Sequence, residues 1–384
     1  MGTTFTGLSG KKASDFGHGK ASLITYMNVF SNPIANPNMI ENVEVDSRQR
    51  EVEVGDVFFT TSSETPEEVG MSSVLKKKIG ITYLNSFCFG FRPSVKFDLD
   101  YLAFMLRSES VRKQIKLLAQ GISRFNIAKT KMMYIDIQVP KIDEQIAIGK
   151  YFAQLDRLIT LHQRKRGRLE NIKKAMLEKM FPKNGADVPE VRFAGFTEDW
   201  EQRNVGDLLI ERDEQAPKSN KYPLMAFIAN EGVAPKGERY DRSSLVTDTV
   251  NKLYKKTEFG DFIYSSNNLE TGSIGLNNYG KASISPVYSI FFPTQIADSD
   301  FLGRRLVRKD FINEMVKWRQ GVIYGQWRIH ESDFVKIKIF VPSVEEQSRI
   351  GSFFRHLDRL ITLHQRKVAL LQNIKKACLE KMFV

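Results

Sequence analysis

Two stretches of the chain place apolar residues at intervals of three and four, which is the period of an amphipathic helix. In the first stretch these positions are Ile148, Phe152, Leu155, Ile159, Leu169, Ile172, Met176 and Met180. The second stretch follows Val341 with the same pattern. A helix of nearly 40 residues is about 57 Å long, so each stretch predicts a helix that no small domain could bury alone.

The two stretches are copies of one sequence. The first reads VPKIDEQIAIGKYFAQLDRLITLHQRK from Val139, and the second reads VPSVEEQSRIGSFFRHLDRLITLHQRK from Val341, at an offset of 202 residues. The likeness continues in NIKKAMLEKMF and NIKKACLEKMF, with about two thirds of the aligned positions identical. Self-similarity at a fixed offset indicates a tandem duplication.

Weaker sequence similarities extend the duplication beyond the helices. VGDVFFTTSS from Val54 resembles FGDFIYSSNN from Phe259, and FDLDYLAFML resembles IADSDFLGRRL. The first copy lacks a counterpart of residues 188–209, so we expect it to be truncated at its start, and the sequence does not establish its opening strand.

The helix starts carry different capping signals. Ser343 and Glu346 have the spacing of a capping box, and Asp143 is the candidate cap in the first copy. Because the helices share one sequence, an antiparallel pair about an approximate two-fold axis is an economical arrangement. The alternative is two separate helices that each cover their own domain.

Aromatic and β-branched residues with turn punctuation fill the segments outside the helices and predict small mixed domains. The expected fold class is α+β, with two mixed α/β target-recognition domains separated by the helix pair. The predicted boundaries are 1–138 for the first domain, 139–187 for its helical spacer, 188–340 for the second domain and 341–384 for the second spacer.

Charge points to a polyanionic partner. The net charge is +12 and the pI about 9.4, and phosphates attract such an excess of Lys and Arg. Each helix contributes about +4. The densest positions, which could contact phosphate or an acidic partner subunit or simply form a solvated face, are Arg164, Lys165, Arg166, Arg168, Arg366 and Lys367.

Several classes of protein lack support in the sequence. Two distant cysteines and the absence of an apolar run or signal core favour the cytoplasm and no membrane. There is no P-loop, no GxGxxG motif and no amino-methyltransferase motif, and GVIYG at Gly321 is only half of a nuclease signature. His162 and His364 lack ligand partners at helical spacing, so neither a metal nor a catalytic site is expected.

The Val-Pro-x-x-x-Glu-Gln helix starts, the LDRLITLHQRK segments and RFAGFTEDWE together resemble type I restriction-modification specificity subunits. This resemblance implies that each domain reads one half of a bipartite, asymmetric site in double-stranded DNA, while the helices set the spacing and dock a pair of modification subunits. Those partners would bring S-adenosylmethionine for adenine methylation. Restriction subunits would use ATP and Mg to translocate and cleave, and this chain would hold no cofactor.

Two other hypotheses remain open at this stage. The chain could be a non-catalytic coiled-coil adaptor that assembles protein partners without reading DNA, or a stand-alone nuclease. Gel shifts with modification subunits separate the first from a DNA reader, and metal-dependent cutting by the purified chain tests the second.

Base reading requires donor and acceptor pairs on loops held by a rigid scaffold. Phe125 and Trp327 occupy matched loop positions and are more typical of core or interface anchors. The DNA-binding candidates are Thr60, Thr61, Ser62, Ser63, Arg124 and Asn126 in the first domain, Ser265, Ser266, Asn267, Asn268, Tyr324, Gln326 and Arg328 in the second, and Lys76, Lys77, Lys78, Lys236 and Arg239 as phosphate contacts.

Overall fold

The structure, a computed structural model, describes residues 2–78, 80–183, 186–235, 252–322 and 326–383. The chain divides into two compact units. Unit 1 is formed by residues 1–165 together with 364–384, and unit 2 by residues 166–363. In the part of the chain that the structure describes, no helix is long and apolar enough to cross a membrane.

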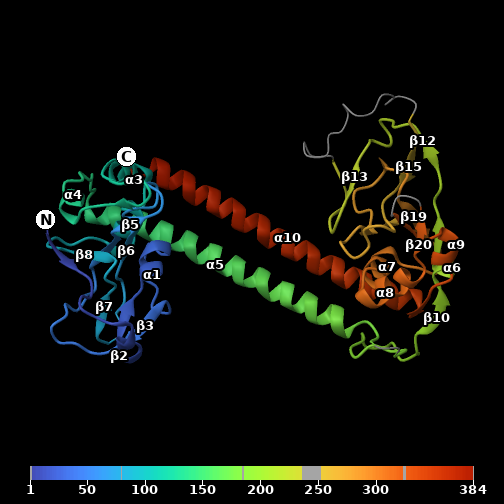
Figure 1. Cartoon of the computed structure of the whole chain (residues 1–384), viewed down its shortest axis with the longest axis horizontal. Coiled ribbons are helices and arrows are strands. Elements are labelled where there is room, and N and C mark those ends of the chain that lie inside the picture. The colour runs from blue at the N-terminus through green and yellow to red at the C-terminus, as the bar shows by residue number, and fades with distance from the viewer. Residues whose placement is uncertain (1, 79, 184–185, 236–251, 323–325, 384) are drawn as a thin grey trace. The chain divides into compact units, whose positions relative to one another are not determined.

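Unit 1 contains a four-stranded antiparallel sheet, a three-stranded sheet and a two-stranded ladder (Figure 1). The four-stranded sheet runs in the order β1 (Gly2–Thr6), β8 (Cys88–Pro93), β4 (Val57–Thr60) and β6 (Ser72–Val74). The three-stranded sheet runs β3 (Ile40–Val43), β2 (Phe16–Ile24) and β7 (Thr82–Leu84), and the ladder pairs β5 (Ser62–Ser63) with β9 (Phe125–Asn126). Its short helices are the 3-10 helix η1 (Ala13–Asp15), α1 (Tyr26–Ser31), α2 (Leu99–Met105), α3 (Glu109–Leu117) and α4 (Lys129–Met132).

Unit 2 repeats the four-stranded sheet in the order β11 (Leu209–Glu211), β19 (Ser289–Pro293), β16 (Phe262–Tyr264) and β17 (Ile274–Leu276). A second sheet contains β12 (Gln215–Ala216), β15 (Tyr254–Thr257) and β18 (Ala282–Ile284). Two-stranded ladders pair β10 (Glu201–Asn204) with β22 (Lys338–Val341), β13 (Ala226–Ile228) with β14 (Gly232–Ala234), and β20 (Gln320–Val322) with β21 (Gln326–Arg328). The short helices are α6 (Val205–Leu208), α7 (Ser299–Arg305), α8 (Lys309–Lys317) and α9 (Glu331–Phe334).

The four-stranded sheets confirm that the duplication includes the domains. Gly2 of β1 pairs with Pro93, and Leu209 of β11 pairs with Pro293, so the opening strand that the sequence left open is formed in unit 1. The second sheets are also related, because β2 runs parallel to β7 and Leu224 forms a parallel bridge with Ser283 of β18. Unit 2 adds the antiparallel pairing of β15 with β18. The two domains therefore share one four-stranded sheet and a parallel pairing in the other.

The predicted long helices are α5 (Ile142–Lys179) and α10 (Val344–Lys381). Each helix divides between the units, with 142–165 of α5 and 364–381 of α10 in unit 1, and 166–179 of α5 and 344–363 of α10 in unit 2. In unit 1 the start of α5 pairs with the end of α10, since Lys375 Nζ lies 2.6 Å from Asp156 Oδ1 and the ring of Phe152 stacks on Phe383 at 5.5 Å. Residue numbers increase along α5 in the direction in which they decrease along α10, so the two helices are antiparallel, as predicted.

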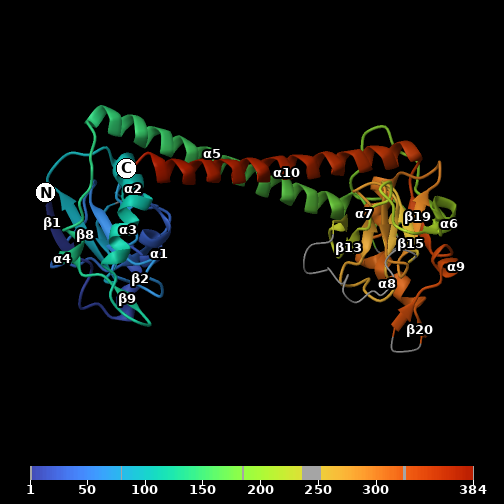
Figure 2. The ribbon, with the colours of Figure 1, turned by 90° about the horizontal axis from the view of Figure 1, so that it is seen from above.

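Unit 2 contains the same arrangement with the helices exchanged. Lys173 Nζ lies 2.6 Å from Asp358 Oδ1, and Phe181 stacks on Phe354 at 6.2 Å. Each of these contacts joins the residues that lie 202 positions from those of the matching unit 1 contact, so α5 and α10 have exchanged roles. Figure 2 shows both helices as continuous elements.

A shared polar contact fixes each helix start to its own domain. The Asp98 amide, just before α2, donates to Gln145 Oε1 at 3.2 Å, and the Asp298 amide, just before α7, donates to Gln347 Oε1 at 3.0 Å. Both glutamines are buried and also donate to a carbonyl five residues earlier, at 2.9 Å in each copy. The repeated glutamine, Gln145 in one copy and Gln347 in the other, therefore docks each helix start to its domain.

The capping predictions need correction. The Glu346 amide lies 3.4 Å from Ser343 Oγ, which is half of a capping box, but the Glu346 carboxylate pairs with Arg192 instead of turning back. Asp143 does not cap α5, because the helix already begins at Ile142. Asp143 lies in the first turn, where a negative charge still favours the helix dipole.

Candidate nucleic-acid interface

The structure brings together the two polar segments that the sequence singled out in the first domain. Ser62 pairs with Asn126 and Ser63 with Phe125, and the Ile127 amide donates to the Thr61 carbonyl at 3.0 Å. We call residues 61–63 and 121–126 the first loop surface. Segments about 60 residues apart in sequence thus form one surface.

Gly121 shapes the turn of this surface. Its φ is +139°, and a Cβ there would lie 2.0 Å from the Arg124 carbonyl oxygen. The backbones of Gln120 and Asn126 exchange two hydrogen bonds across the turn, at 3.0 and 2.8 Å. Only glycine suits this close approach, so the tight turn presents the residues at its tip, including Arg124.

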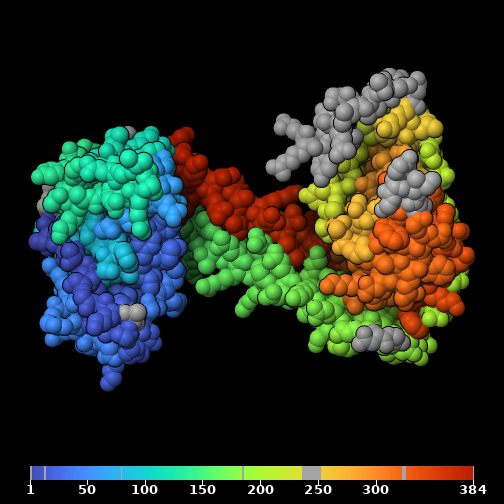
Figure 3. All heavy atoms as spheres, viewed as in Figure 1, coloured from blue at the N-terminus to red at the C-terminus, as the bar shows by residue number. Residues whose placement is uncertain are grey.

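Unit 2 builds an equivalent surface by side-chain capping. The Trp327 amide donates to Asn267 Oδ1 at 2.5 Å, and the Ile329 amide donates to Ser266 Oγ at 3.0 Å. We call residues 265–268, 320–322 and 326–328 the second loop surface. Its β20–β21 hairpin projects from the body of unit 2 in Figure 2, and α7, α8 and the following chain, coloured orange, form much of the visible face of unit 2 in Figure 3.

The loop surfaces expose side chains with hydrogen-bonding groups, next to the apolar Ile122, which is 98% exposed. Arg124 and Asn126 are exposed in unit 1, and Gln326 and Arg328 are exposed in unit 2. Arg328 has a carboxylate neighbour, with a guanidinium nitrogen 3.4 Å from Glu331 Oε2. Trp327 is 49% exposed, which places an aromatic face beside these polar groups and does not fit a core anchor.

The polar run of the first domain lies inside the fold. Thr60 is fully buried, and its Oγ1 accepts the Met71 amide at 3.0 Å. Thr61 Oγ1 donates to the Phe87 carbonyl at 2.8 Å, and Ser63 Oγ donates to Glu68 Oε2 at 3.3 Å. Ser62 and Ser63 are buried as well. These hydroxyl groups hold the loop, so the base-reading hypothesis rests on Arg124 and Asn126.

The corresponding run of the second domain is divided. Ser265 is buried and Ser266 Oγ accepts the Ile329 amide just after β21, whereas Asn267 and Asn268 are exposed. Asn267 uses its carbonyl oxygen for the Trp327 amide. Asn267 and Asn268 are therefore the exposed part of this run.

Two arginines that the sequence pattern did not single out fix the loops. Arg112 on α3 donates to the carbonyls of Glu67, Val69 and Gly70 at 2.7 to 2.8 Å. Burial lowers the pKa of Arg112 to about 10, so it stays charged at neutral pH. Arg319, after α8, donates to the Ser266 carbonyl at 3.0 Å and to both Glu270 carboxylate oxygens at 2.7 Å. Their roles depend on loop carbonyls about 40 to 55 residues away in the sequence, so the sequence pattern gave no signal for them.

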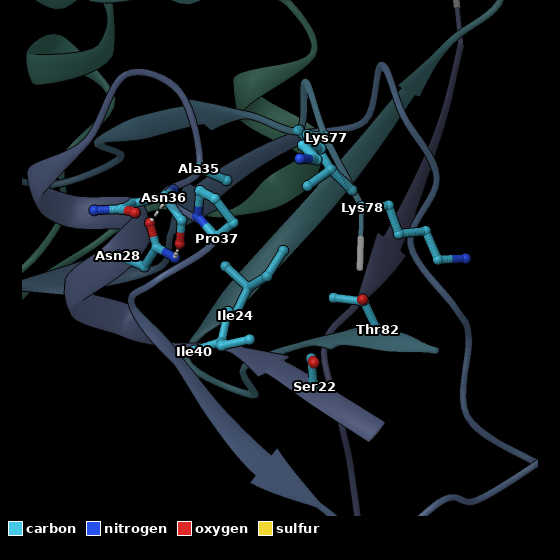
Figure 4. A pocket seen from close by; sticks show the side chains of 11 residues that line it. Ser22, Ile24, Asn28, Ala35, Asn36, Pro37, Ile40, Lys77, Lys78 and Thr82 are labelled. Atoms are coloured by element: carbon cyan, nitrogen blue, oxygen red, sulfur yellow. Dashed lines mark hydrogen bonds between the residues drawn. The ribbon is translucent and has the colours of Figure 1, made fainter. Parts of the chain in front are cut away.

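The three consecutive lysines differ in their surroundings. Lys76 Nζ lies 2.6 Å from Asp100 Oδ2, and Lys78 Nζ lies 2.5 Å from Glu51 Oε1. Lys77 is exposed, and with Lys78 it borders a pocket of about 20 Å³ beside Asn28 (Figure 4). That volume holds about one water molecule, so the pocket is no ligand site. Lys236, Arg239 and Tyr324 lie outside the described residues.

The helix basic cluster divides between the units. Arg164, Lys165, Arg366 and Lys367 are all exposed in unit 1, close to a contact in which His162 Nδ1 lies 2.8 Å from His364 Nδ1. In unit 2, Arg168 is exposed and Arg166 lies 3.3 Å from Glu170. The unit 1 group is thus a solvent-facing positive patch on the paired helices.

Metal-ligating side chains do not gather in the described part of the chain. No group of three or more His, Cys, Asp and Glu side chains converges there in a way that could hold a metal ion. The His162–His364 contact is a pair with lysines nearby, and like charge disfavours a cation at that place.

Comparison with known proteins identifies the family. The sequence profile described as "Type I restriction modification DNA specificity domain" matches twice, over residues 18–171 and 197–373. The chain belongs to this family. The double match coincides with the duplication, and each match contains most of one domain and most of the helix that follows it.

Relatives and solved structures of the family cover most of the chain. The putative type I restriction enzyme MjaX specificity subunit of Methanocaldococcus jannaschii is 23% identical, over 84% of this chain and 76% of the relative. The MjaVIII specificity subunit of the same organism is 24% identical, over 68% and 64%. The crystal structure of the type I restriction-modification S subunit from M. genitalium aligns with a TM-score of 0.59 at 14% identity, over 100% of this chain and 94% of that one, which shows a shared fold.

Proposed function

We propose that this chain is the DNA sequence-recognition subunit of a type I restriction-modification complex and that it reads a bipartite, asymmetric site in double-stranded DNA. The observation that carries the proposal is the pair of loop surfaces, one in each unit, built at equivalent positions of the duplication but with different exposed side chains. Arg124 and Asn126 in unit 1 correspond in place to Gln326 and Arg328 in unit 2. Two loop surfaces with equivalent backbone positions but different exposed side chains suit two different half-sites.

The exposed side chains have the chemistry of base readers. Arginine donates two hydrogen bonds to guanine O6 and N7, and asparagine or glutamine pairs with adenine N6 and N7. Both types are present in each half of the proposed interface. Lys77 and the unit 1 basic cluster would contact phosphate, which adds affinity but no sequence information.

The chemistry would belong to partner subunits. A pair of modification subunits would supply S-adenosylmethionine and methylate adenine, and restriction subunits would supply the ATP-dependent and Mg-dependent translocation and cleavage. We propose that this chain contributes recognition and assembly without a catalytic residue. Family membership supports this assignment, because the matching profile describes a DNA specificity domain.

The test is coexpression with the modification subunit, followed by mapping of methylated adenines across a genome. We expect one two-part motif with a fixed spacer. The adaptor alternative predicts that double substitution of Arg124 and Gln326 by alanine leaves the methylated motif unchanged. An unchanged motif in a variant that still assembles the complex would reject DNA reading by these surfaces.

A further inference from the structure

Ile122 is 98% exposed, more than any other large apolar residue in the part of the chain that the structure describes. It packs in none of the hydrophobic clusters described for unit 1, so the fold gains no burial from it. Single exposed apolar residues are common on protein surfaces. Ile122 differs from these in its place, since it lies on the turn between Gln120 and Asn126 in the first loop surface.

The turn that carries Ile122 is fixed by its own backbone. The Gln120 amide donates to the Asn126 carbonyl at 3.0 Å, and the Asn126 amide donates to the Gln120 carbonyl at 2.8 Å. Gly121 passes so close to the Arg124 carbonyl that a Cβ would lie 2.0 Å from its oxygen. A turn that is closed in this way has little freedom to lose when it binds. Ile122 is therefore presented on a preorganised loop.

The exposed neighbours of Ile122 on this turn are polar. Ser123, Arg124 and Asn126 are all exposed. Phe125, in contrast, is half-buried and packs against a core cluster of unit 1. An apolar side chain thus lies among the hydrogen-bonding side chains that we assign to base reading.

The major groove of DNA offers a specific partner for such a side chain. Thymine presents its 5-methyl group there, whereas the other bases present hydrogen-bond donors and acceptors. An isoleucine against the methyl group removes apolar surface from water, but against a polar base edge it would displace water without replacing its hydrogen bonds. The second copy also has a β-branched apolar residue at this point, since Val322 follows Gly321 as Ile122 follows Gly121.

We propose that Ile122 is a specificity-determining residue that reads a thymine, through its 5-methyl group, in the half-site bound by unit 1. This role rests on the proposed function, because it requires that the first loop surface faces base edges. Arg124 and Asn126 would read neighbouring base pairs by hydrogen bonds. The half-site bound by unit 1 then contains an A·T pair where the tip of the turn meets the groove.

The test uses the full chain assembled with the modification subunit, on a duplex that carries the motif found by methylation mapping. Uracil replaces each thymine of the motif in turn, which removes one methyl group and keeps the base pair. Fluorescence anisotropy should show one position at which uracil weakens binding about fourfold, the effect of one buried methylene-sized group. Ile122→Ala should bind the thymine and uracil duplexes equally at that position.

Val54→Ala is the matched control. Val54 is 56% exposed in the same unit and precedes β4, whereas Thr61 of the first loop surface follows the other end of that strand. It should keep the fourfold difference of the parent. Ile122→Val should keep most of it, because valine retains a branched apolar side chain.

A methylation map without a two-part motif would reject the proposed function itself. Where the motif exists, the proposal alone is overturned if no uracil position weakens binding, or if Ile122→Ala keeps the discrimination of the parent. Phe87, 60% exposed, is the neighbouring apolar residue, and its carbonyl accepts the Thr61 amide at 3.0 Å. Loss of discrimination in Phe87→Ala but not in Ile122→Ala would assign the methyl contact to Phe87 and overturn the proposal as well.

Discussion

The glutamines that dock the two long helices are identical in the two copies, whereas residues exposed on the loop surfaces differ. The Oε1 atoms of Gln145 and Gln347 each accept a hydrogen bond from the backbone amide that precedes a domain helix. In contrast, Asn126 and Arg328 occupy matched loop positions with unlike side chains. A buried contact tolerates little change in shape, while an exposed loop side chain changes at small cost to stability.

Arg124→Ala should weaken binding to the specific duplex by about 1–3 kcal/mol and leave binding to random DNA nearly unchanged, because a base contact gives discrimination. Fluorescence anisotropy on both duplexes at several salt concentrations measures this. Lys113→Ala is the control and should behave as the parent, because the Lys113 side chain is exposed and pairs with Glu109 on its own helix α3. An equal loss on both duplexes would assign Arg124 to phosphate.

The His162–His364 contact should make unit 1 less stable in acid. Burial, followed by the charges of His364, Lys367 and Lys165, lowers the pKa of His162 below its ordinary value of 6.5. The unfolded chain then binds the proton more readily, so this stability is complete above about pH 6.5 and is lost as pH falls through that value. Melting temperatures between pH 7.5 and 5 should fall less in His162→Gln than in the parent.

His356→Gln is the matched control for that pH series, since His356 is exposed on the same helix α10. It should keep the full pH dependence of the parent. A parent-like slope in His162→Gln would show that another group causes the loss.

Individual side-chain roles were only partly predictable from sequence. The sequence placed Arg124 on a loop, and in the structure Arg124 is exposed on that loop. Its role in base reading stays a prediction. The burial of Thr60 and Ser62 was not foreseen, because a polar run after a strand looks alike whether its hydroxyls face solvent or satisfy the loop backbone. The ion pairs of Lys76 and Lys78 depend on Asp100 and Glu51, whose proximity only the fold decides.

At the scale of elements, the long helices followed from the sequence and the second sheets did not. Periodicity and internal repetition place α5 and α10 within the predicted spacer ranges, because a long amphipathic pattern has few alternative structures. The short strands of the second sheet carry no such signal. Their pairing, parallel between β2 and β7 and antiparallel between β15 and β18, depends on long-range contacts.

Two helix glycines should respond oppositely to alanine. A Cβ at Gly351 would lie 2.4 Å from Asp298 Oδ1 and 3.1 Å from the Phe301 amide, so Gly351→Ala should lower stability by about 1–3 kcal/mol. A Cβ at Gly167 would meet no neighbouring atom within 4 Å, and the other copy has Ala369 there, so Gly167→Ala should add about 1 kcal/mol. Differential scanning calorimetry should show shifts of opposite sign; a stabilised Gly351→Ala would contradict the docking geometry.

For the molecule as a whole, the proposed division of labour predicts that each loop surface controls one half of the target. Asn126→Ala should relax the methylated motif in one half only, and Gln326→Ala should relax only the other. Each unit has its own loop surface, so the effects should be separable. Methylation mapping in cells that express the modification subunit measures both, and relaxation of both halves by either substitution would contradict the division.

The exchange of helix halves also sets an order of events during synthesis. Phe383 belongs to the core of unit 1, and it packs against Tyr101 and Phe152. The intervening residues 166–363 must be translated first, which takes about 10–40 s at 5–20 residues per second. Throughout that interval the nascent first domain presents an unfinished apolar surface on the ribosome, so chaperone dependence and premature termination should affect the domain that is made first.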